Sequence, residues 1–172
     1  MKKIKVSTEF VVKSAVIAAL YTVLTLVVAP ISFGMVQCRI AEALCVLCAF
    51  TPAAVPGLAV GCMIANVFSF NPIDIVFGTF ATLVAAICAR KLRNVRWGGI
   101  AWLVPLPAVL VNMFIVGLEL AIYCPLEGKG FLVGFCLQAL SVGAGQMVAC
   151  YILGIPLFIM INKSNLKNLI NE

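Results

Sequence analysis

The residues best able to do chemistry in this sequence are polar side chains that interrupt long apolar runs. They are carboxylates, amides and one guanidinium, in a chain that has no histidine. Carboxylates accept hydrogen bonds, whereas amides both donate and accept them, so this set suits recognition of a small polar ligand better than bond breaking. The candidate ligand-binding residues are Gln37, Arg39, Glu42, Asn66, Asp74, Asn112, Glu119 and Gln146.

The same residues predict neither an enzyme nor a metal site. There is no paired-aspartate site and no nucleophile–base pair, and Cys45 and Cys48 form a C-x-x-C without a second pair inside an apolar stretch. We therefore expect no metal and no cofactor. The G-x-x-x-x-G-K-[ST] nucleotide motif is also absent from the sequence, so any energy source must come from elsewhere. A disulfide between two of Cys38, Cys124 and Cys136 stays open.

The composition requires most of the chain to lie in a membrane. Of the 172 residues, 64% are hydrophobic and 10% are charged, compared with about 25% charged in a soluble domain. A helix crosses the hydrocarbon core with roughly 20 apolar residues. We predict an all-α membrane protein with six transmembrane helices, forming one domain over residues 1–172. The predicted spans cover residues 10–29, 38–51, 53–69, 73–89, 100–123 and 131–161.

The first apolar run has a competing interpretation as a cleaved signal peptide. Glu9 and Lys13 interrupt the basic start, and the apolar run that follows is too long for a signal peptide's apolar core. We therefore expect a retained first helix. The second span has only about 14 residues and should be tilted or begin below the interface.

Basic residues set the predicted orientation. Ten of the twelve Lys and Arg residues fall in the first 13 residues, in the fourth-to-fifth connection or in the tail. Positive residues stay in the cytoplasm, so both termini are predicted to be cytoplasmic. Topology and attraction to anionic lipid explain these charges, and nucleic acid is not a predicted partner. Most of the candidate ligand-binding residues then lie toward the outer face of the membrane, with Gln146 nearer the middle of its segment.

The stretch between the first two spans is a candidate gate over a ligand pocket. Pro30 and Gly34 break the apolar run, and Gln37, Arg39 and Glu42 follow as the inner wall. Arg39 and Glu42 are three residues apart, so they can pair on one helical face. An ion pair that only fixes the entry of the helix into the membrane explains these two residues equally well.

The ligand that this polar set fits best is a guanine-like heterocycle, whose edge presents two adjacent donors beside a carbonyl. Aromatic side chains near the same membrane face could stack on its ring for about 1–3 kcal/mol each. Interfacial or core packing is the simpler explanation for any one of them. These aromatic residues are Phe33, Phe68, Phe70 and Tyr123.

Small residues spaced by four let helix backbones approach closely. Packing inside the bundle explains any single pair, whereas docking to another membrane protein is most attractive for the first pair. The pairs are Ala15 with Ala19, Gly57 with Gly61, and Ser141 with Gly145.

Several of these motifs together resemble the QueT family over nearly the whole chain. The stretch Ala-Pro-Ile-Ser-Phe-Gly followed by Gln-x-Arg-x-x-Glu is the most distinctive part of the resemblance. At Gln146 the chain departs from the family pattern, in which an acidic residue often follows the glycine. The residues that carry the resemblance are Ala29–Gly34, Gln37–Leu44, Asp74–Gly78, Ala81–Leu83, Trp102–Pro107, Asn112 and Ser141–Gly143.

The resemblance implies a substrate-binding S component of an energy-coupling factor (ECF) transporter in the bacterial plasma membrane. Its partners would be a membrane scaffold subunit, met through Ala15 and Ala19, and two ATPase subunits. The implied substrate is a queuosine precursor, meaning a deazaguanine base, queuine or queuosine. Three alternatives stay open: an S component for another vitamin or purine, a standalone transporter, and a small membrane enzyme acting on lipids.

Overall fold

The computed structural model describes residues 7–32, 39–68 and 72–164, and within these ranges the chain is helical with no strand. The all-α prediction is confirmed for these residues. The helices are α1 (Thr8–Val27), α2 (Ala29–Ser32), η1 (Ile40–Ala49), α3 (Ala54–Val67), α4 (Pro72–Lys91), η2 (Leu92–Asn94), α5 (Leu106–Tyr123), α6 (Phe131–Met147), η3 (Val148–Leu153) and α7 (Gly154–Lys163).

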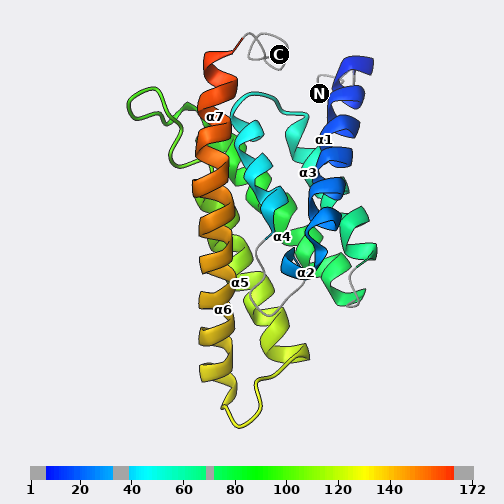
Figure 1. Ribbon diagram of the computed structural model, residues 1–172, viewed down its shortest axis with the longest axis vertical. Coiled ribbons are helices and arrows are strands. Elements are labelled where there is room, and N and C mark those ends of the chain that lie inside the picture. The colour runs from blue at the N-terminus through cyan, green and yellow to red at the C-terminus, as the bar shows by residue number, and fades with distance from the viewer. Residues whose placement is uncertain (1–6, 33–38, 69–71, 165–172) are drawn as a thin grey trace, which may run out of the picture.

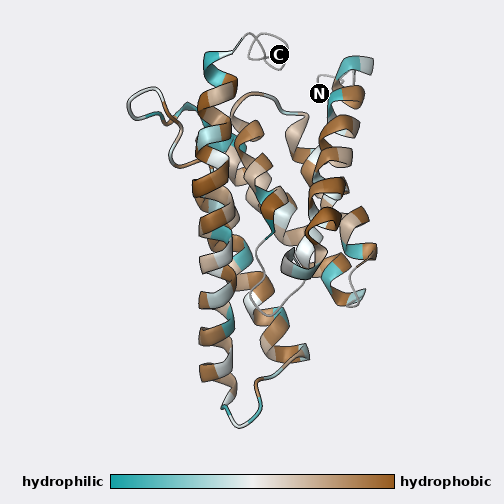
Figure 2. Cartoon of the chain, viewed as in Figure 1, coloured by the Kyte–Doolittle hydropathy of each residue, from teal (hydrophilic) through white to brown (hydrophobic). Residues whose placement is uncertain are grey.

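Four helical stretches among the described residues are long and apolar enough to cross a membrane. Hydrophobic residues cover most of the length of these helices (Figure 2). Two apolar helices, η1 and α3, are shorter, so the expected number of six spans stays a prediction. The four long stretches are Thr8–Val27, Pro72–Asn94, Leu106–Tyr123 and Phe131–Lys163.

Two of the predicted segments differ from the structure, and the sequence explains the first difference. The fifth helix begins at Leu106 rather than at residue 100, because Pro105 and Pro107 favour the first turn of a helix over its interior. The second segment, Ile40–Ala49, is a 3₁₀-helix rather than an α-helix. The last segment is one continuous helical stretch, as predicted, with a π-helical portion at Val148–Leu153.

The helices form a bundle around η1. Helix α1 packs against α3, α4 lies between α3 and α5, and α5 packs against α6. The 3₁₀-helix η1 contacts α1, α4, η3 and α7, and its residues from Ala41 to Ala49 are all buried. The first turn of α1 and the last turn of α7 lie at one end of the bundle, here called the termini end (Figure 1). The connection between α5 and α6 lies at the opposite end, here called the hairpin end.

Glycines bring α1 and α3 into close contact. A Cβ atom on Gly57 would lie 2.8 Å from the carbonyl oxygen of Ser14, and one on Gly61 would lie 2.7 Å from the Cβ of Tyr21. The hydroxyl of Thr22 donates to the carbonyl of Gly61 at 3.1 Å. The prediction that this pair of glycines serves packing inside the bundle is confirmed.

Candidate functional site

An ion pair lies buried where η1, α3 and α4 meet. Arg39, which immediately precedes η1, donates through one terminal nitrogen to Asp74 Oδ2 at 2.5 Å, and the two side chains are 2% and 4% exposed. Asn66, in the last turn of α3, donates to the backbone carbonyl of Asp74 at 2.7 Å. Asp74 lies in the first turn of α4, where the helix dipole favours a negative charge. These three predicted residues therefore converge on one point.

Glu42, one turn into η1, is held by two hydroxyl groups. Tyr21 of α1 donates to Glu42 Oε1 at 2.6 Å, and Thr82 of α4 donates to the same oxygen at 3.1 Å. All three side chains are buried. Within the described residues no group donates to the second oxygen, Oε2, so the carboxylate is fixed in orientation through one oxygen while the other keeps its capacity to accept.

Two cysteine sulfurs connect these groups. Cys62 Sγ lies 3.3 Å from Thr82 Oγ1, 3.6 Å from an Arg39 terminal nitrogen and 3.5 Å from Asn66 Nδ2. Cys150 Sγ lies 3.6 Å from the backbone oxygen of Glu42. Sulfur forms only weak hydrogen bonds, so these contacts establish proximity more than energy.

Cys150, in η3, also connects the neighbouring helix α6 to these groups. Its sulfur lies 3.7 Å from Gln146 Oε1, so Gln146 stands beside the start of η1. The connected set is called the buried polar network below. Its members are Tyr21, Arg39, Glu42, Cys62, Asn66, Asp74, Thr82, Gln146 and Cys150.

A glycine makes room for this network. A Cβ atom on Gly78 would lie 2.6 Å from Asp74 Oδ1, 2.8 Å from Asn66 Nδ2 and 3.2 Å from an Arg39 terminal nitrogen. Real Cβ contacts are essentially never shorter than 3.0 Å. Any other residue at this position would therefore displace the ion pair, which gives the predicted motif from Asp74 to Gly78 a steric reason.

Part of the network's hydrogen-bonding capacity is unused within the described residues. Asp74 Oδ1 is buried and has no partner there. The contact of the Gln146 side chain with Cys150 is made by its amide oxygen. A buried polar group without a partner costs about 1–3 kcal/mol. A site that binds a polar ligand is expected to have buried hydrogen-bonding atoms of this kind, which the ligand can satisfy.

Two of the remaining predicted residues are buried on α5, and the third lies outside the described ranges. Asn112 and Glu119 both belong to α5 and are 1% exposed. Asn112 Nδ2 donates to the carbonyl of Ala108, one turn earlier in its own helix, at 2.9 Å. Gln37 lies outside the described residues.

Three predictions about individual contacts need correction or stay open. The ion-pair partner of Arg39 is Asp74 rather than Glu42, because the fold brings the start of α4 against the start of η1. Phe68 and Tyr123 are 60% and 50% exposed, so they do not stack inside the buried site. The other two candidate stacking residues, Phe33 and Phe70, lie outside the described residues. Of the predicted gate, Pro30 lies in the short helix α2, and Gly34 lies outside the described residues. Of the cysteines considered for a disulfide, Cys124 and Cys136 are free thiols, and Cys38 lies outside the described residues.

Sequence reasoning missed four members of the network, which are Tyr21, Cys62, Cys150 and Thr82. A signal was available for the last, because Asp74, Gly78 and Thr82 are spaced by four and therefore share one face of α4. Cys62 is likewise four residues before Asn66 on α3. The sequence indicates only weakly that Tyr21 belongs to the network, because it is a single phenol in an apolar helix.

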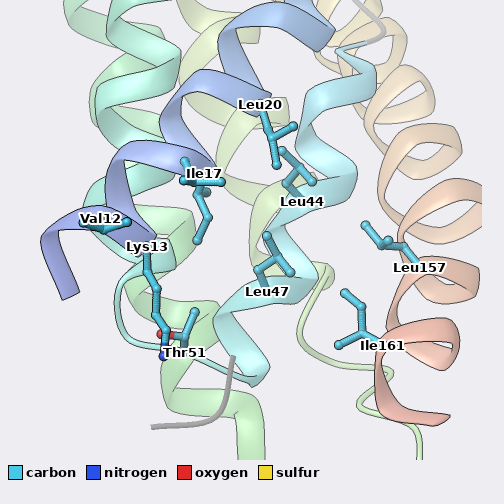
Figure 3. Close-up of a pocket in the computed structure, with 10 residues that line it drawn as sticks. Val12, Lys13, Ile17, Leu20, Leu44, Leu47, Thr51, Leu157 and Ile161 are labelled. Atoms are coloured by element: carbon cyan, nitrogen blue, oxygen red, sulfur yellow. The ribbon is translucent and has the colours of Figure 1, made fainter. Parts of the chain in front are cut away.

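A second, apolar feature lies toward the termini end. It is a cavity of about 370 Å³ between α1, η1 and α7, here called the apolar groove. Aliphatic side chains from these elements face a shared space, and Lys13 and Thr51 lie at one end of it (Figure 3). The groove contains no carboxylate or amide, so it does not suit a polar heterocycle. Its lining residues are Val12, Lys13, Val16, Ile17, Leu20, Leu44, Leu47, Thr51, Leu157 and Ile161.

Apolar helices long enough to cross a bilayer, packed around a buried polar network, define a multi-pass membrane protein. A family model described as QueT transporter matches residues 11–163. The chain therefore belongs to the QueT transporter family, a family of transporters rather than enzymes.

One curated relative extends this result. The chain is 38% identical over 86 residues to a protein from Lactococcus lactis subsp. cremoris (strain MG1363) named queuosine precursor transporter QueT. The matched stretch covers 49% of this chain and 50% of the relative, so the chain spans about half the length of the curated relative it matches. No solved structure matches the chain.

Proposed function

We propose that this protein is the substrate-binding S component of an ECF-type importer and captures a queuosine precursor. The precursor is a deazaguanine base, queuine or queuosine, bound from the outer side of the bacterial plasma membrane. The chain's membership of the QueT transporter family and the name of its relative support the substrate class. Both termini would be cytoplasmic, in agreement with the shared position of the first and last helical turns (Figure 1).

The observation that carries this proposal is a buried carboxylate with one oxygen left to accept, in the same buried polar network as an amide. Glu42 Oε2 keeps its acceptor capacity because Tyr21 and Thr82 bind the other oxygen. Gln146 has an amide nitrogen to donate, and Cys150 Sγ lies between the amide oxygen of Gln146 and the backbone oxygen of Glu42. A deazaguanine presents N–H donors next to a carbonyl, so the carboxylate would accept from the ring while the amide donates to the carbonyl.

The other predicted residues complete the proposed site. Arg39, Asp74 and Asn66 hold the ends of three helical segments together and so fix the position of Glu42. Asn112 and Glu119 would approach the ligand from α5. Gln37 would contribute from the stretch before η1.

The surface of α1 is the proposed docking site for the ECF scaffold subunit. In its most apolar window 22% of residues are buried, compared with 39–44% in the other three long stretches. Ala15 and Ala19 lie on the exposed side of this helix, where their small side chains would let a partner helix approach closely. The apolar groove adjoins this surface. Two ATPase subunits would supply the energy through that scaffold.

Direct binding tests the substrate. The purified protein is titrated with preQ0, preQ1, queuine and queuosine, and with guanine, riboflavin and biotin as comparison ligands. Saturable binding restricted to the first group is expected; binding restricted to riboflavin or biotin would replace the substrate, and no binding to any compound would overturn the assignment. Glu42→Gln should abolish binding, whereas the exposed Glu127→Gln serves as its matched control.

Reconstitution tests the transport mechanism. Proteoliposomes are prepared with this chain alone and with a scaffold subunit and both ATPases. Uptake only in the complete, ATP-containing vesicles is expected, and uptake by the chain alone would establish a standalone transporter instead. Ala15→Leu and Ala19→Leu should abolish uptake while leaving ligand binding unchanged. Loss of binding in these variants would place their effect in the ligand site and contradict the docking role.

A further inference from the structure

The last turn of α4 and the connection that follows it carry a concentration of positive charge that the described protein does not neutralise. Arg90, Lys91, Arg93 and Arg96 fall within seven residues. Among the described residues the ion pairs are those of Lys13 and Arg39, so none of these four cations has a carboxylate partner there. Their hydrogen bonds go to backbone carbonyls, as in the 2.9 Å bond from Arg90 to Cys48 and the 3.2 Å bond from Arg93 to Arg90.

A tight turn after this run presents a tryptophan. The backbones of Trp97 and Ile100 exchange hydrogen bonds of 2.9 and 3.1 Å. The two residues between them, Gly98 and Gly99, have φ values of 59° and 81°, a conformation that suits glycine at both central positions of the turn. Trp97 is 85% exposed as a result. The turn projects from the side of the bundle at the termini end (Figure 1).

Behind the turn lies a cavity of about 490 Å³ that combines a cation with apolar surface. Arg96 lines it, with its guanidinium 5.8 Å from the ring centre of Phe158 and its Nε 3.5 Å from the carbonyl oxygen of Arg93. Tyr151 also lines the cavity and donates to the backbone carbonyl of Trp102 at 3.2 Å. The complete lining is Val95, Arg96, Trp97, Trp102, Leu103 and Tyr151.

We propose that this cavity is a binding site for an anionic phospholipid. The phosphate would pair with Arg96, and the glycerol and upper acyl chain would pack against Trp102, Leu103 and Tyr151. Clusters of Lys and Arg next to membrane helices attract anionic lipid, and tryptophan prefers the level of the headgroups. The apolar lining favours a lipid over a soluble phosphate, and the position at the start of a membrane-spanning helix puts the site at headgroup depth.

Quenching of tryptophan fluorescence tests this proposal, because Trp97 and Trp102 are the two tryptophans of the chain. The full chain is placed in nanodiscs containing phosphatidylglycerol or phosphatidylcholine with bromine on the acyl chain. We expect half-maximal quenching at a mole fraction about fivefold lower for phosphatidylglycerol, as one basic residue near anionic lipid would give. Soluble glycerol phosphate should not compete. Equal quenching by the two lipids, or full competition by glycerol phosphate, would overturn the site.

Variants localise the effect. Trp97→Phe leaves Trp102 as the reporter inside the cavity, and its quenching should keep the preference for phosphatidylglycerol. In that background Arg96→Gln should remove the preference, whereas Arg96→Lys should retain it. Lys129→Gln makes the same charge change on the exposed hairpin end and should have no effect. A loss of preference in Lys129→Gln equal to that in Arg96→Gln would indicate diffuse attraction and refute a defined site.

Discussion

The two ion pairs within the described residues are nearly equal in length and opposite in setting. Glu9 and Lys13 lie 2.7 Å apart, one turn from each other on α1 at the rim of the apolar groove, with side chains 53% and 19% exposed. Arg39 and Asp74 lie 2.5 Å apart inside the buried polar network and come from different elements. Water and counter-ions solvate the charges of the first pair whether or not the pair forms. In the second pair each buried charge is neutralised by the other.

The difference teaches that burial, rather than distance, decides what an ion pair contributes. An exposed pair of this kind is worth about 0.2–1 kcal/mol. Breaking a buried pair costs about 3–5 kcal/mol, because the remaining charge is left without a partner. Substitution of Glu9 or Lys13 should therefore change stability little, whereas substitution of one member of the Arg39–Asp74 pair should destabilise the protein.

The largest predicted effect comes from breaking the buried pair. Arg39→Met should lower the free energy of unfolding in detergent by about 3–5 kcal/mol, because Asp74 is left charged and buried. Arg39→Met combined with Asp74→Leu should recover most of this loss, because neither charge is then buried alone. Thermal unfolding measures both variants, and equal destabilisation of the single and the double variant would contradict this account.

A smaller loss is expected from crowding the same pair. Gly78→Ala places a Cβ atom 2.6 Å from Asp74 Oδ1 and should cost about 1–3 kcal/mol, as overpacking of a filled interior does. The matched control is Gly134→Ala on α6, where a Cβ atom would meet nothing within 4 Å. There the change should be neutral or slightly stabilising, since alanine favours a helix more than glycine does. Equal loss in both variants would show that the network is not the cause.

The third prediction removes one hydroxyl from Glu42. Tyr21→Phe deletes the 2.6 Å hydrogen bond to Oε1 but keeps the ring in place. We expect a loss of about 1.5 kcal/mol in stability, as for a hydrogen bond to a charged group, and weaker ligand binding because Glu42 is less firmly oriented. Calorimetry on the same preparation measures both quantities. Tyr123→Phe, at a half-exposed position, should change neither.

The smallest effect is expected at the exposed pair. Lys13→Gln removes the partner of Glu9 and should change stability by no more than about 0.5 kcal/mol, as measured for pairs spaced by four on a helix. Repeating the measurement in 1 M salt should erase even this difference, since the screening length there is about 3 Å. A loss approaching that of Arg39→Met would mean that the groove is less accessible to water than its exposure indicates.

Much of the fold could be predicted because charge is scarce in this chain. The long apolar runs gave α1, α4 and the continuous stretch Phe131–Lys163 to within a few residues. Because polar residues are rare in the apolar runs, those that occur there were expected to be buried next to one another. Five of them do lie in one network: Arg39, Glu42, Asn66, Asp74 and Gln146.

The partners within that network could not be predicted, because partner choice depends on packing between distant segments. Arg39 and Asp74 are 35 residues apart, and the nearer carboxylate of Glu42 was the natural expectation. Tyr21 and Cys62 resemble ordinary core residues until α1 and α3 are seen to pack on η1. The start of α5 was placed too early, because residues 100–105 are apolar enough for a membrane helix but form turns before Pro105 and Pro107.

The 3₁₀ geometry of η1 determines which of its side chains face which part of the bundle. With three residues per turn, every third side chain lies in a straight column, so the helix is a three-sided prism rather than a cylinder. One column contains Glu42 and faces the polar network. A second holds Leu44 and Leu47 and faces the groove. The third holds Ala43 and Val46, whose atoms lie 3.2 Å from a Cβ built on Gly154.

Each column of η1 therefore faces a different part of the bundle, and a single inserted residue would rotate all three columns by about 120°.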